Sequence, residues 1–327
     1  MNPIGTSSIA FLGLSGVIWG GWLIGSQTTG GQEALARAYA QYVQTERAGE
    51  AQDLFAPNAL RAFVCGVGSG PLQGATAKPC LAVAAAGRMF IIDAGAGAAL
   101  SLESHHIPLG KLESVLLTGA DPVRSADLNE LWVNYQADGG AATLPVYGPT
   151  ESHDVVRGIN ATLAAQKQTP GLQPWAPAPE PGKPVIVFEG DGLTVMAFTT
   201  EADAHTGRVG YRFDYRGRSL VVAGDGRAEW ANATKDADVV LHGAQSEGFA
   251  QLHEDGADNA TPFEVASAAR SAGAGMLVLT GIDESPVMQD LQVREAKQAG
   301  LPDVIAGRVG MLLELPLANG SVNVRPL

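Results

Sequence analysis

The stretch "GYRFDYRGRSLVVAGDG", residues 210–226, decides the fold. Apolar residues recur at the spacing of a strand on both sides of the pair Arg216-Gly217. Two such runs around a glycine-containing turn are typical of paired strands. The stretch therefore predicts a strand pair that ends in a glycine-rich loop at Asp225.

Similar patterns recur on both sides of this stretch. "PVIVFEGDGLTVMAFTT", residues 184–200, predicts another strand pair, and "CLAVAAAGRMFIIDAG", residues 80–95, predicts a hairpin that ends at Asp93. Helical patterns follow apolar runs at residues 261–272 and 286–299. Strands thus cluster in each half of the chain and a helix follows several of them, which predicts two sheets packed face to face with helices outside.

Three further segments carry local predictions. Residues 125–135 and 150–166 have helical patterns. Six prolines between residues 170 and 184 predict an irregular loop without a regular element. The glycines of "CGVGSG", residues 65–70, resemble a dinucleotide-binding fingerprint, but a proline-bearing loop and a strand follow them instead of a helix, so that interpretation is excluded.

Four motifs in chain order carry a family resemblance. They are "CGVGSGP" at residues 65–71, "DAG" at 93–95, "GYRFDYRGRSLVVAGDG" at 210–226 and "NATPFEVA" at 259–266. This order resembles the metallo-β-lactamase-fold superfamily, and more closely its ribonuclease Z/arylsulfatase-like branch. The resemblance implies an α/β fold, a four-layer αββα sandwich. It also implies a place outside the cytoplasm, because relatives of this type carry an N-terminal signal or anchor.

The resemblance also implies where two zinc ions are held. The ligand positions carry over to Gly119, Asp121, Val123, Arg124, Ala202, Asp225 and Gly281, and Asn259 takes the place of a proton-transfer histidine. Only Asp225 keeps the family's residue. Gly, Val and Ala offer no side-chain lone pair, so these positions do not form the usual zinc site. We expect no metal, no cofactor and no catalytic residue here: a degenerate member, a pseudoenzyme and not an enzyme.

Arg124 and Asp225 carry a more specific prediction. A buried carboxylate without its ion would be an uncompensated charge, which is costly. We therefore expect an Arg124–Asp225 ion pair in place of the metal centre. In the alternative, Arg124 points to solvent and Asp225 caps its own turn. A makeshift site around His205 and neighbouring aspartates is a further, less favoured alternative.

The N-terminal region predicts a membrane anchor. The run Ile9–Gly25 holds no charged residue and has about the minimum length of a transmembrane helix. A cleaved secretory signal is the alternative, but no Lys or Arg precedes the run. Small residues four apart let two helices approach closely in lipid, and such pairs occur at Gly16, Gly20, Gly21 and Gly25.

Domain boundaries and location follow from these points. We divide the chain into an anchor and linker (residues 1–31), a helical connector (32–60) and a metallo-β-lactamase-like domain (61–327). Arg37 and Arg47 after the span weakly favour a cytoplasmic body. The only two cysteines, Cys65 and Cys80, lie close enough in sequence to pair, and a disulfide suits an oxidising compartment. Together with the family resemblance, this favours the periplasm.

Composition limits the function classes. The 327-residue chain has a net charge of −13, so we expect no nucleic-acid partner. The favoured hypothesis is a catalytically inactive, membrane-anchored structural or accessory subunit that contacts other proteins through its transmembrane helix and globular body. A ligand-binding module in the old active-site cleft and a residual hydrolase with an atypical metal site are the alternatives.

Overall fold

The computed structural model describes residues 53–68, 77–200, 207–226, 230, 232–244, 260–281 and 285–327, together with residues 30, 33, 34 and 37. The chain divides into two compact units, residues 1–53 and 54–327. In the first unit residues 30, 33, 34 and 37 are helical, and Asp53 begins a 3₁₀ turn. The predicted membrane span, its glycines and most of the predicted connector lie outside the described residues. Among the helices that are described, none is long and apolar enough to cross a membrane.

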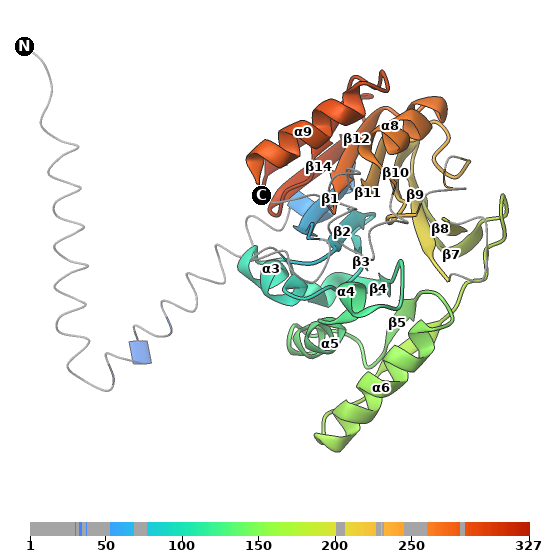
Figure 1. Ribbon diagram of the computed structural model, residues 1–327. Helices are drawn as coiled ribbons and strands as arrows, with labels where there is room; N and C mark the ends of the chain where they lie inside the picture. The colour runs from blue at the N-terminus through green and yellow to red at the C-terminus, as the bar shows by residue number, and fades with distance from the viewer. Residues whose placement is uncertain are drawn as a thin grey trace, which may run out of the picture. The chain divides into compact units, whose positions relative to one another are not determined.

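Two β-sheets form the centre of the second unit (Figure 1). The first sheet has eight strands, in the order β15 (Asn323–Pro326), β14 (Met311–Pro316), β1 (Ala59–Gly66), β2 (Cys80–Ala85), β3 (Arg88–Ile92), β4 (Leu112–Leu116), β5 (Leu144–Tyr147) and β6 (Leu172–Trp175). The second has seven, in the order β13 (Val304–Ala306), β12 (Met276–Thr280), β11 (Val239–Gly243), β10 (Arg218–Val222), β9 (Val209–Tyr215), β8 (Leu193–Thr199) and β7 (Val185–Gly190).

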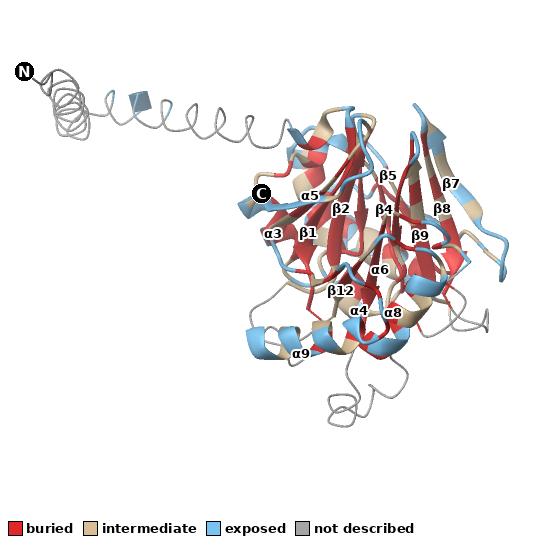
Figure 2. Ribbon diagram, turned by 90° about the horizontal axis from the view of Figure 1, so that it is seen from above, coloured by how far each residue is buried: buried red, intermediate tan, exposed pale blue. Residues whose placement is uncertain are grey.

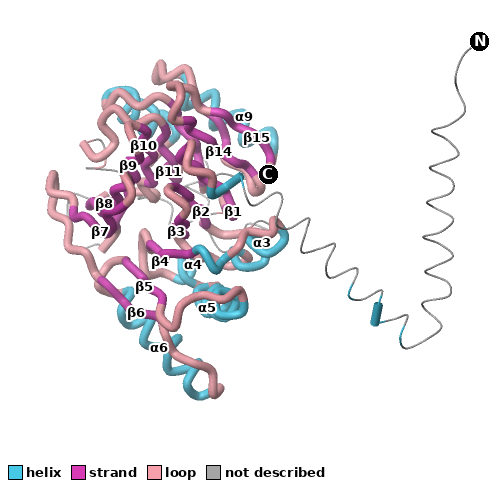
Figure 3. Tube along the Cα trace, turned by 180° about the vertical axis from the view of Figure 1, so that it is seen from behind, coloured by secondary structure: helices cyan, strands magenta, loops and turns pink. Residues whose placement is uncertain are grey.

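Helices cover the outer faces of both sheets (Figure 3). The first sheet carries α3 (Ala98–Ser104), α4 (Pro122–Ser125), α5 (Leu128–Ala137) and α6 (Ser152–Ala165), and the second carries α8 (Pro262–Ser271) and α9 (Pro286–Lys297). Short 3₁₀ turns stand at η1 (Asp53–Phe55) and η2 (Leu109–Lys111). The predicted sandwich of two sheets between helices is thus present in the described residues.

Strand β1 shows how one sequence pattern contributes to two layers of core. Every one of its residues is buried, because both faces of the strand are covered (Figure 2). Leu60, Ala62 and Val64 belong to the cluster between the two sheets, with Tyr211 and Phe213 of the second sheet. Their neighbours Phe63 and Cys65 point the other way, into a cluster with α3 and α5. A third cluster lies between the second sheet and its helices.

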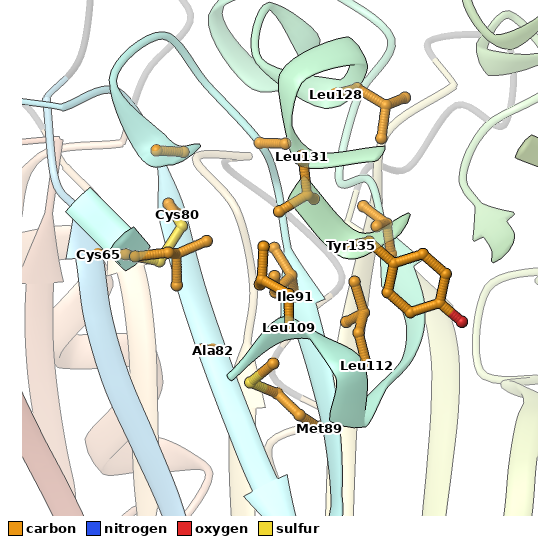
Figure 4. Packing of buried hydrophobic residues seen from close by; sticks show 14 of the residues in the cluster. Cys65, Cys80, Ala82, Met89, Ile91, Leu109, Leu112, Leu128, Leu131 and Tyr135 are labelled. Carbon is orange, nitrogen blue, oxygen red and sulfur yellow. A yellow bond between two sulfur atoms is a disulfide. The ribbon is translucent and has the colours of Figure 1, made fainter. Parts of the chain in front are cut away.

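A disulfide joins Cys65, near the end of β1, to Cys80, the first residue of β2. The two residues belong to the apolar cluster under α3 and α5 (Figure 4). No free cysteine remains among the two in the chain. The bond closes the segment between β1 and β2, part of which is described.

Two local predictions need correction. Residues 172–175 form strand β6 inside the proline-rich segment, where we predicted no element. β6 pairs with β5 at the edge of its sheet, and an edge strand tolerates Pro174 because its outer side needs no hydrogen-bond donor. The helix predicted over 125–135 is α5, which begins at Leu128, three residues later than predicted, and a separate short helix, α4, ends at Ser125.

Candidate functional site

The candidate site lies where three strands end and one begins. β3 leads into Asp93, β4 leads into Thr118 and the turn before α4, and β10 leads into Asp225. Arg208 stands directly before β9. β3 pairs in parallel with β4, and β9 pairs with β10. The site residues of each sheet thus lie at the ends of its strands, where α/β folds commonly carry their functional sites.

Arg124 is at the centre of this site. Asp121 caps the short helix α4 by accepting a hydrogen bond from the Val123 amide at 3.1 Å. The resulting turn directs the Arg124 side chain inward, where only 8% of it is exposed. Its backbone carbonyl accepts from the Ala94 amide at 2.7 Å. The helix is therefore tied to the loop after β3 and holds the guanidinium in place.

The guanidinium contacts polar groups on three sides. Nε donates to the Thr118 hydroxyl at 2.9 Å, and Nη1 donates to Asp121 at 2.5 Å. Nη2 donates to Asp225 Oδ2 at 2.6 Å. The ion pair that we expected between Arg124 and Asp225 is therefore present, and the alternative of a solvent-facing arginine is wrong.

Arg208 is a second cation at the same carboxylate. Its Nη1 forms an ion pair with Asp225 Oδ1, so the two oxygens of Asp225 each face an arginine. About a third of the Arg208 side chain is exposed. Arg208 was not among the site residues predicted from the sequence. Its position just before "GYRFDY" was visible, but no local pattern distinguishes it from the other arginines of that segment.

Asp93 is a third carboxylate near Arg124. It accepts hydrogen bonds from both the amide and the hydroxyl of Thr118, each at 2.7 Å, and it lies 4.0 Å from Arg124 Nε. Its φ of 57° is uncommon for a residue other than glycine, although Asp is among those that tolerate it. The bonds to Thr118 hold it there.

The pKa values of the cluster follow from burial and charge. Burial raises the pKa of Asp93 to about 7, although Arg124 and the Thr118 hydrogen bonds oppose the shift. Burial also acts to raise the pKa of Asp225, but Arg124 and Arg208 outweigh it and hold that pKa below its usual value. Burial acts to lower the pKa of the Arg124 guanidinium, but Asp225, Asp93 and Asp121 outweigh it and raise that pKa above its usual value. We therefore take Arg124 and Asp225 as charged at neutral pH.

The remaining predicted positions do not supply ligands in the described residues. Gly119 leaves room for the arginine, because a Cβ there would lie 3.1 Å from Arg124 Cδ and 3.0 Å from Asp121 Oδ2. Val123 contributes its capping amide. Gly281 donates its amide to the Val67 carbonyl at 2.9 Å. Ala202, Asn259 and His205 lie outside the described residues.

His242 lies against the loop that carries Asp225. It is fully buried, and its Nε2 lies 3.0 Å from the Gly226 carbonyl while its Nδ1 contacts the Gly243 carbonyl. Burial lowers its pKa, although the carbonyl contacts and Asp225 oppose the shift. Both ring nitrogens therefore face backbone oxygens, which makes His242 a structural histidine between two loops.

These residues do not fit the pair of zinc ions that the resemblance implies. Zinc prefers imidazole and thiolate, with carboxylates in support. Within the described ranges, no group of three or more His, Cys, Asp or Glu is arranged to hold a metal ion. The guanidiniums of Arg124 and Arg208 instead face the surviving aspartate. The geometry can stabilise anionic groups by paired charge, and we derive no metal-dependent step from it.

Known proteins share this architecture. No protein-family model matches the sequence. The metallo-β-lactamase fold protein YhfI from Bacillus subtilis superposes with a TM-score of 0.63 at 19% identity, over 79% of this chain and 99% of that protein. The short form of human tRNase Z superposes with a TM-score of 0.62 at 16% identity, over 78% of this chain and 99% of that protein. The chain has the metallo-β-lactamase fold.

A curated relative refines this placement. The ribonuclease Z of Mycobacterium sp. (strain KMS) is 29% identical over 245 residues, which cover 68% of this chain and 83% of the relative. The similarity agrees with the ribonuclease Z branch of the metallo-β-lactamase superfamily. It is a likeness to that enzyme and does not transfer the enzyme's substrate to this chain.

The comparisons contradict our prediction that this metallo-β-lactamase-fold chain is not an enzyme. The relative named ribonuclease Z and the structural neighbour tRNase Z are hydrolytic enzymes. The prediction of a pseudoenzyme depended on the replaced zinc ligands alone. A donor set determines which metal a site can bind, and it does not determine whether another chemistry operates in the same fold.

Proposed function

We propose that the chain is an accessory subunit of a membrane protein complex, held by its N-terminal segment and contacting other subunits through its metallo-β-lactamase-like body. The observation that carries the proposal is the Arg124 ion pair with Asp225 at 2.6 Å. It joins side chains at positions that the family resemblance gives to zinc ligands. A site filled by internal ion pairs supports a rigid scaffold for binding.

The N-terminal sequence supports the membrane part of the proposal. Residues 9–25 hold no charge, and glycines four apart at Gly16 and Gly20 suit close packing against another transmembrane helix. Such a segment serves both as an anchor and as a contact to a partner helix. We propose that residues 32–60 connect it to the globular body.

The disulfide supports a periplasmic body. Cys65 and Cys80 are paired, and disulfides persist in oxidising compartments such as the periplasm. Closing a loop of this size contributes roughly 3 kcal/mol in the chain-entropy account. Digestion by a membrane-impermeant protease in spheroplasts, whose inner membrane is still intact, supports this location, and digestion only after the inner membrane is opened argues for the cytoplasm.

The test compares three forms of the chain expressed in its own host. They are the full chain, a form without residues 1–31, and the full chain with Gly16→Leu and Gly20→Leu. We expect the full chain to stay in the membrane after a high-salt wash and to purify in mild detergent with the same partner proteins at fixed stoichiometry. The truncated form should be released from the membrane.

The glycine variant separates anchoring from assembly. We expect it to remain in the membrane, because Leu suits lipid as well as Gly does, and to lose partner proteins that contact the transmembrane helix. A full chain that purifies as a monomer without partners contradicts the proposal. So does a truncated form that stays in the membrane fraction although no partner accompanies it.

A hydrolytic function is the second candidate. The 29% identity to a ribonuclease Z supports it, whereas the net charge of −13 disfavours RNA as the substrate. The assay follows release of nitrophenolate from bis(p-nitrophenyl) phosphate by the native chain and by Asp225→Asn. Turnover that is lost in the variant supports hydrolysis at this site, and turnover that is equal in both assigns the activity to another part of the preparation.

A further inference from the structure

The cluster around Arg124 connects the two sheets. Asp93, Thr118 and Arg124 follow strands β3 and β4 of the first sheet. Asp225 follows β10, and Arg208 precedes β9, in the second sheet. The ion pair between Arg124 and Asp225 therefore bridges the two sheets. The two residues are 101 positions apart in the chain.

Two hydrogen bonds beside the cluster also connect the first sheet to the second. The Val209 amide donates to the Thr118 carbonyl at 3.1 Å, and the buried Tyr211 hydroxyl donates to the Leu117 carbonyl at 2.9 Å. These bonds fix the distance between the strand ends. The charged side chains fill the space beside them, so their net charge must be balanced locally.

The charges around Arg124 are unusual for a single buried arginine. Its guanidinium nitrogens lie within 4.0 Å of three carboxylates, those of Asp93, Asp121 and Asp225. Arg208 adds the second positive charge at Asp225. Asp93 is buried, whereas the side chains of Asp225 and Asp121 are 26% and 38% exposed. Carboxylates held this close together repel one another unless cations lie between them, and in other proteins these cations are often metal ions.

Gly119 completes the arrangement. Its missing side chain leaves the space in which the Arg124 chain passes, since a Cβ at 119 would meet Arg124 Cδ at 3.1 Å and Nε at 3.5 Å. A side chain at 119 and the Arg124 side chain in its present position would therefore compete for the same space. Restoring a side chain at 119 alone would push against the guanidinium.

We infer that Arg124 serves as an internal cation that joins the two sheets by neutralising the carboxylates of Asp93, Asp121 and Asp225, with Arg208 as its partner at Asp225. The inference is independent of the proposed accessory role, because it concerns how the fold is held together. It predicts that the positive charge at position 124 is required, and that an added cation can replace it.

The test measures thermal unfolding of the full chain with Mn²⁺ as the probe, because Mn²⁺ accepts an all-oxygen ligand set. Arg124→Met removes the charge and keeps an unbranched side chain. Arg61→Met is the matched control, because Arg61 is also buried but pairs with one carboxylate, Glu314, at 2.8 Å. We expect millimolar Mn²⁺ to raise the midpoint of Arg124→Met by about 4 °C and those of the native chain and the control by less than about 1 °C.

Arg124→Lys separates charge from shape. Lysine keeps the cation and loses the fork of the guanidinium, so we expect a midpoint between those of the native chain and Arg124→Met and no response to Mn²⁺. A lysine variant that behaves like the methionine variant overturns the inference, because shape and not charge then decides. A native chain that Mn²⁺ stabilises as strongly as Arg124→Met also overturns it.

A double variant covers the case in which Arg124→Met does not fold. Adding Asp225→Asn removes one of the uncompensated carboxylates, so the double variant should fold and unfold at a higher temperature than Arg124→Met alone. Failure of both the double variant and refolding in Mn²⁺ overturns the inference. Recovery by either one supports it.

Discussion

Two buried arginines, Arg61 and Arg124, show what is unusual about the candidate site. Arg61 lies on β1 and is 3% exposed. Its Nε donates to Glu314 at 2.8 Å, and its other nitrogens donate to the Ala56 carbonyl and the Asn58 side chain at 2.7 and 2.8 Å. One charged partner and two neutral partners balance its single charge. Arg61 therefore stabilises the local attachment of the turn before β1 to the strand.

Arg124 is equally buried but has the opposite balance. Three carboxylates surround it, and a second arginine is needed at Asp225. The difference shows that negative charge, and not the arginine, is the excess at this site. Carboxylates that lie close together, with at least one of them buried, require a cation, and here arginine side chains supply it. The following predictions test this contrast between the two arginines.

The largest expected effect is the loss of Arg124. Arg124→Met should lower the free energy of unfolding by about 3–5 kcal/mol, because it leaves buried carboxylates without their partner. Arg61→Met should cost less, about 1–3 kcal/mol, because it leaves one carboxylate, that of Glu314, without its partner, whereas Arg124 lies beside three. Urea unfolding at pH 7 measures both. Equal losses in the two variants would remove the distinction between the two sites.

Coupling between Arg124 and Asp225 should be the next largest effect. In a double-mutant cycle with Arg124→Met and Asp225→Asn we expect an interaction free energy of about 1–3 kcal/mol. The matched cycle combines Arg124→Met with Glu314→Gln, which share no partner, and should be additive within about 0.5 kcal/mol. A coupling for the first pair as small as that for the second would contradict the ion pair.

The pH dependence of stability should come from Asp93. The pKa of Asp93 rises from 3.8 to about 7 on folding, so the native state holds this proton more tightly than the unfolded state. Its contribution is complete below the unfolded pKa and is lost as the pH rises through about 7. Stability should therefore fall by up to about 1.4 kcal/mol per pH unit between about pH 4 and pH 7 and level off above pH 7, where both states have lost the proton.

Asp93→Asn provides the control for this pH effect. Asn does not ionise, so unfolding free energies measured from pH 5.5 to 8.5 should be flatter in the variant than in the native chain. Arg61→Met should keep the native slope, because Asp93 is not among its partners. A native profile as flat as that of Asp93→Asn contradicts the raised pKa.

The smallest expected effect is the loss of Arg208. Since 36% of its side chain is exposed, water screens its ion pair with Asp225. Arg208→Gln should cost less than about 1 kcal/mol, and the cost should shrink in 0.5 M salt. A loss as large as that of Arg124→Met would make Arg208 the main cation and would reverse the roles proposed for the two arginines.

The sequence predicted the sandwich well because strand patterns and turn residues are local signals. The pair of strands in "GYRFDYRGRSLVVAGDG" appears as β9 and β10. β6 was missed because its pairing with β5 is a tertiary contact that proline composition conceals. The helix boundary near Asp127 was missed because backbone bonds to the β3 loop, and not local preference, set it.

The candidate site was predicted only in part. Arg124 and Asp225 were paired in advance because the resemblance placed both at one metal site. Arg208 and Thr118 were not, since their roles depend on contacts between segments far apart in the chain. The prediction that the chain is not an enzyme was wrong. It assumed that the loss of the zinc ligands excludes every kind of catalysis in this fold.

The most direct test of the internal cation is an anomalous-diffraction experiment on crystals of the native chain soaked in zinc and measured at the zinc absorption edge. The account predicts continuous density for the Arg124 guanidinium between Asp121 and Asp225 and no anomalous peak within about 4 Å of the Asp225 carboxylate. An anomalous peak at that carboxylate, with Arg124 displaced, would contradict it.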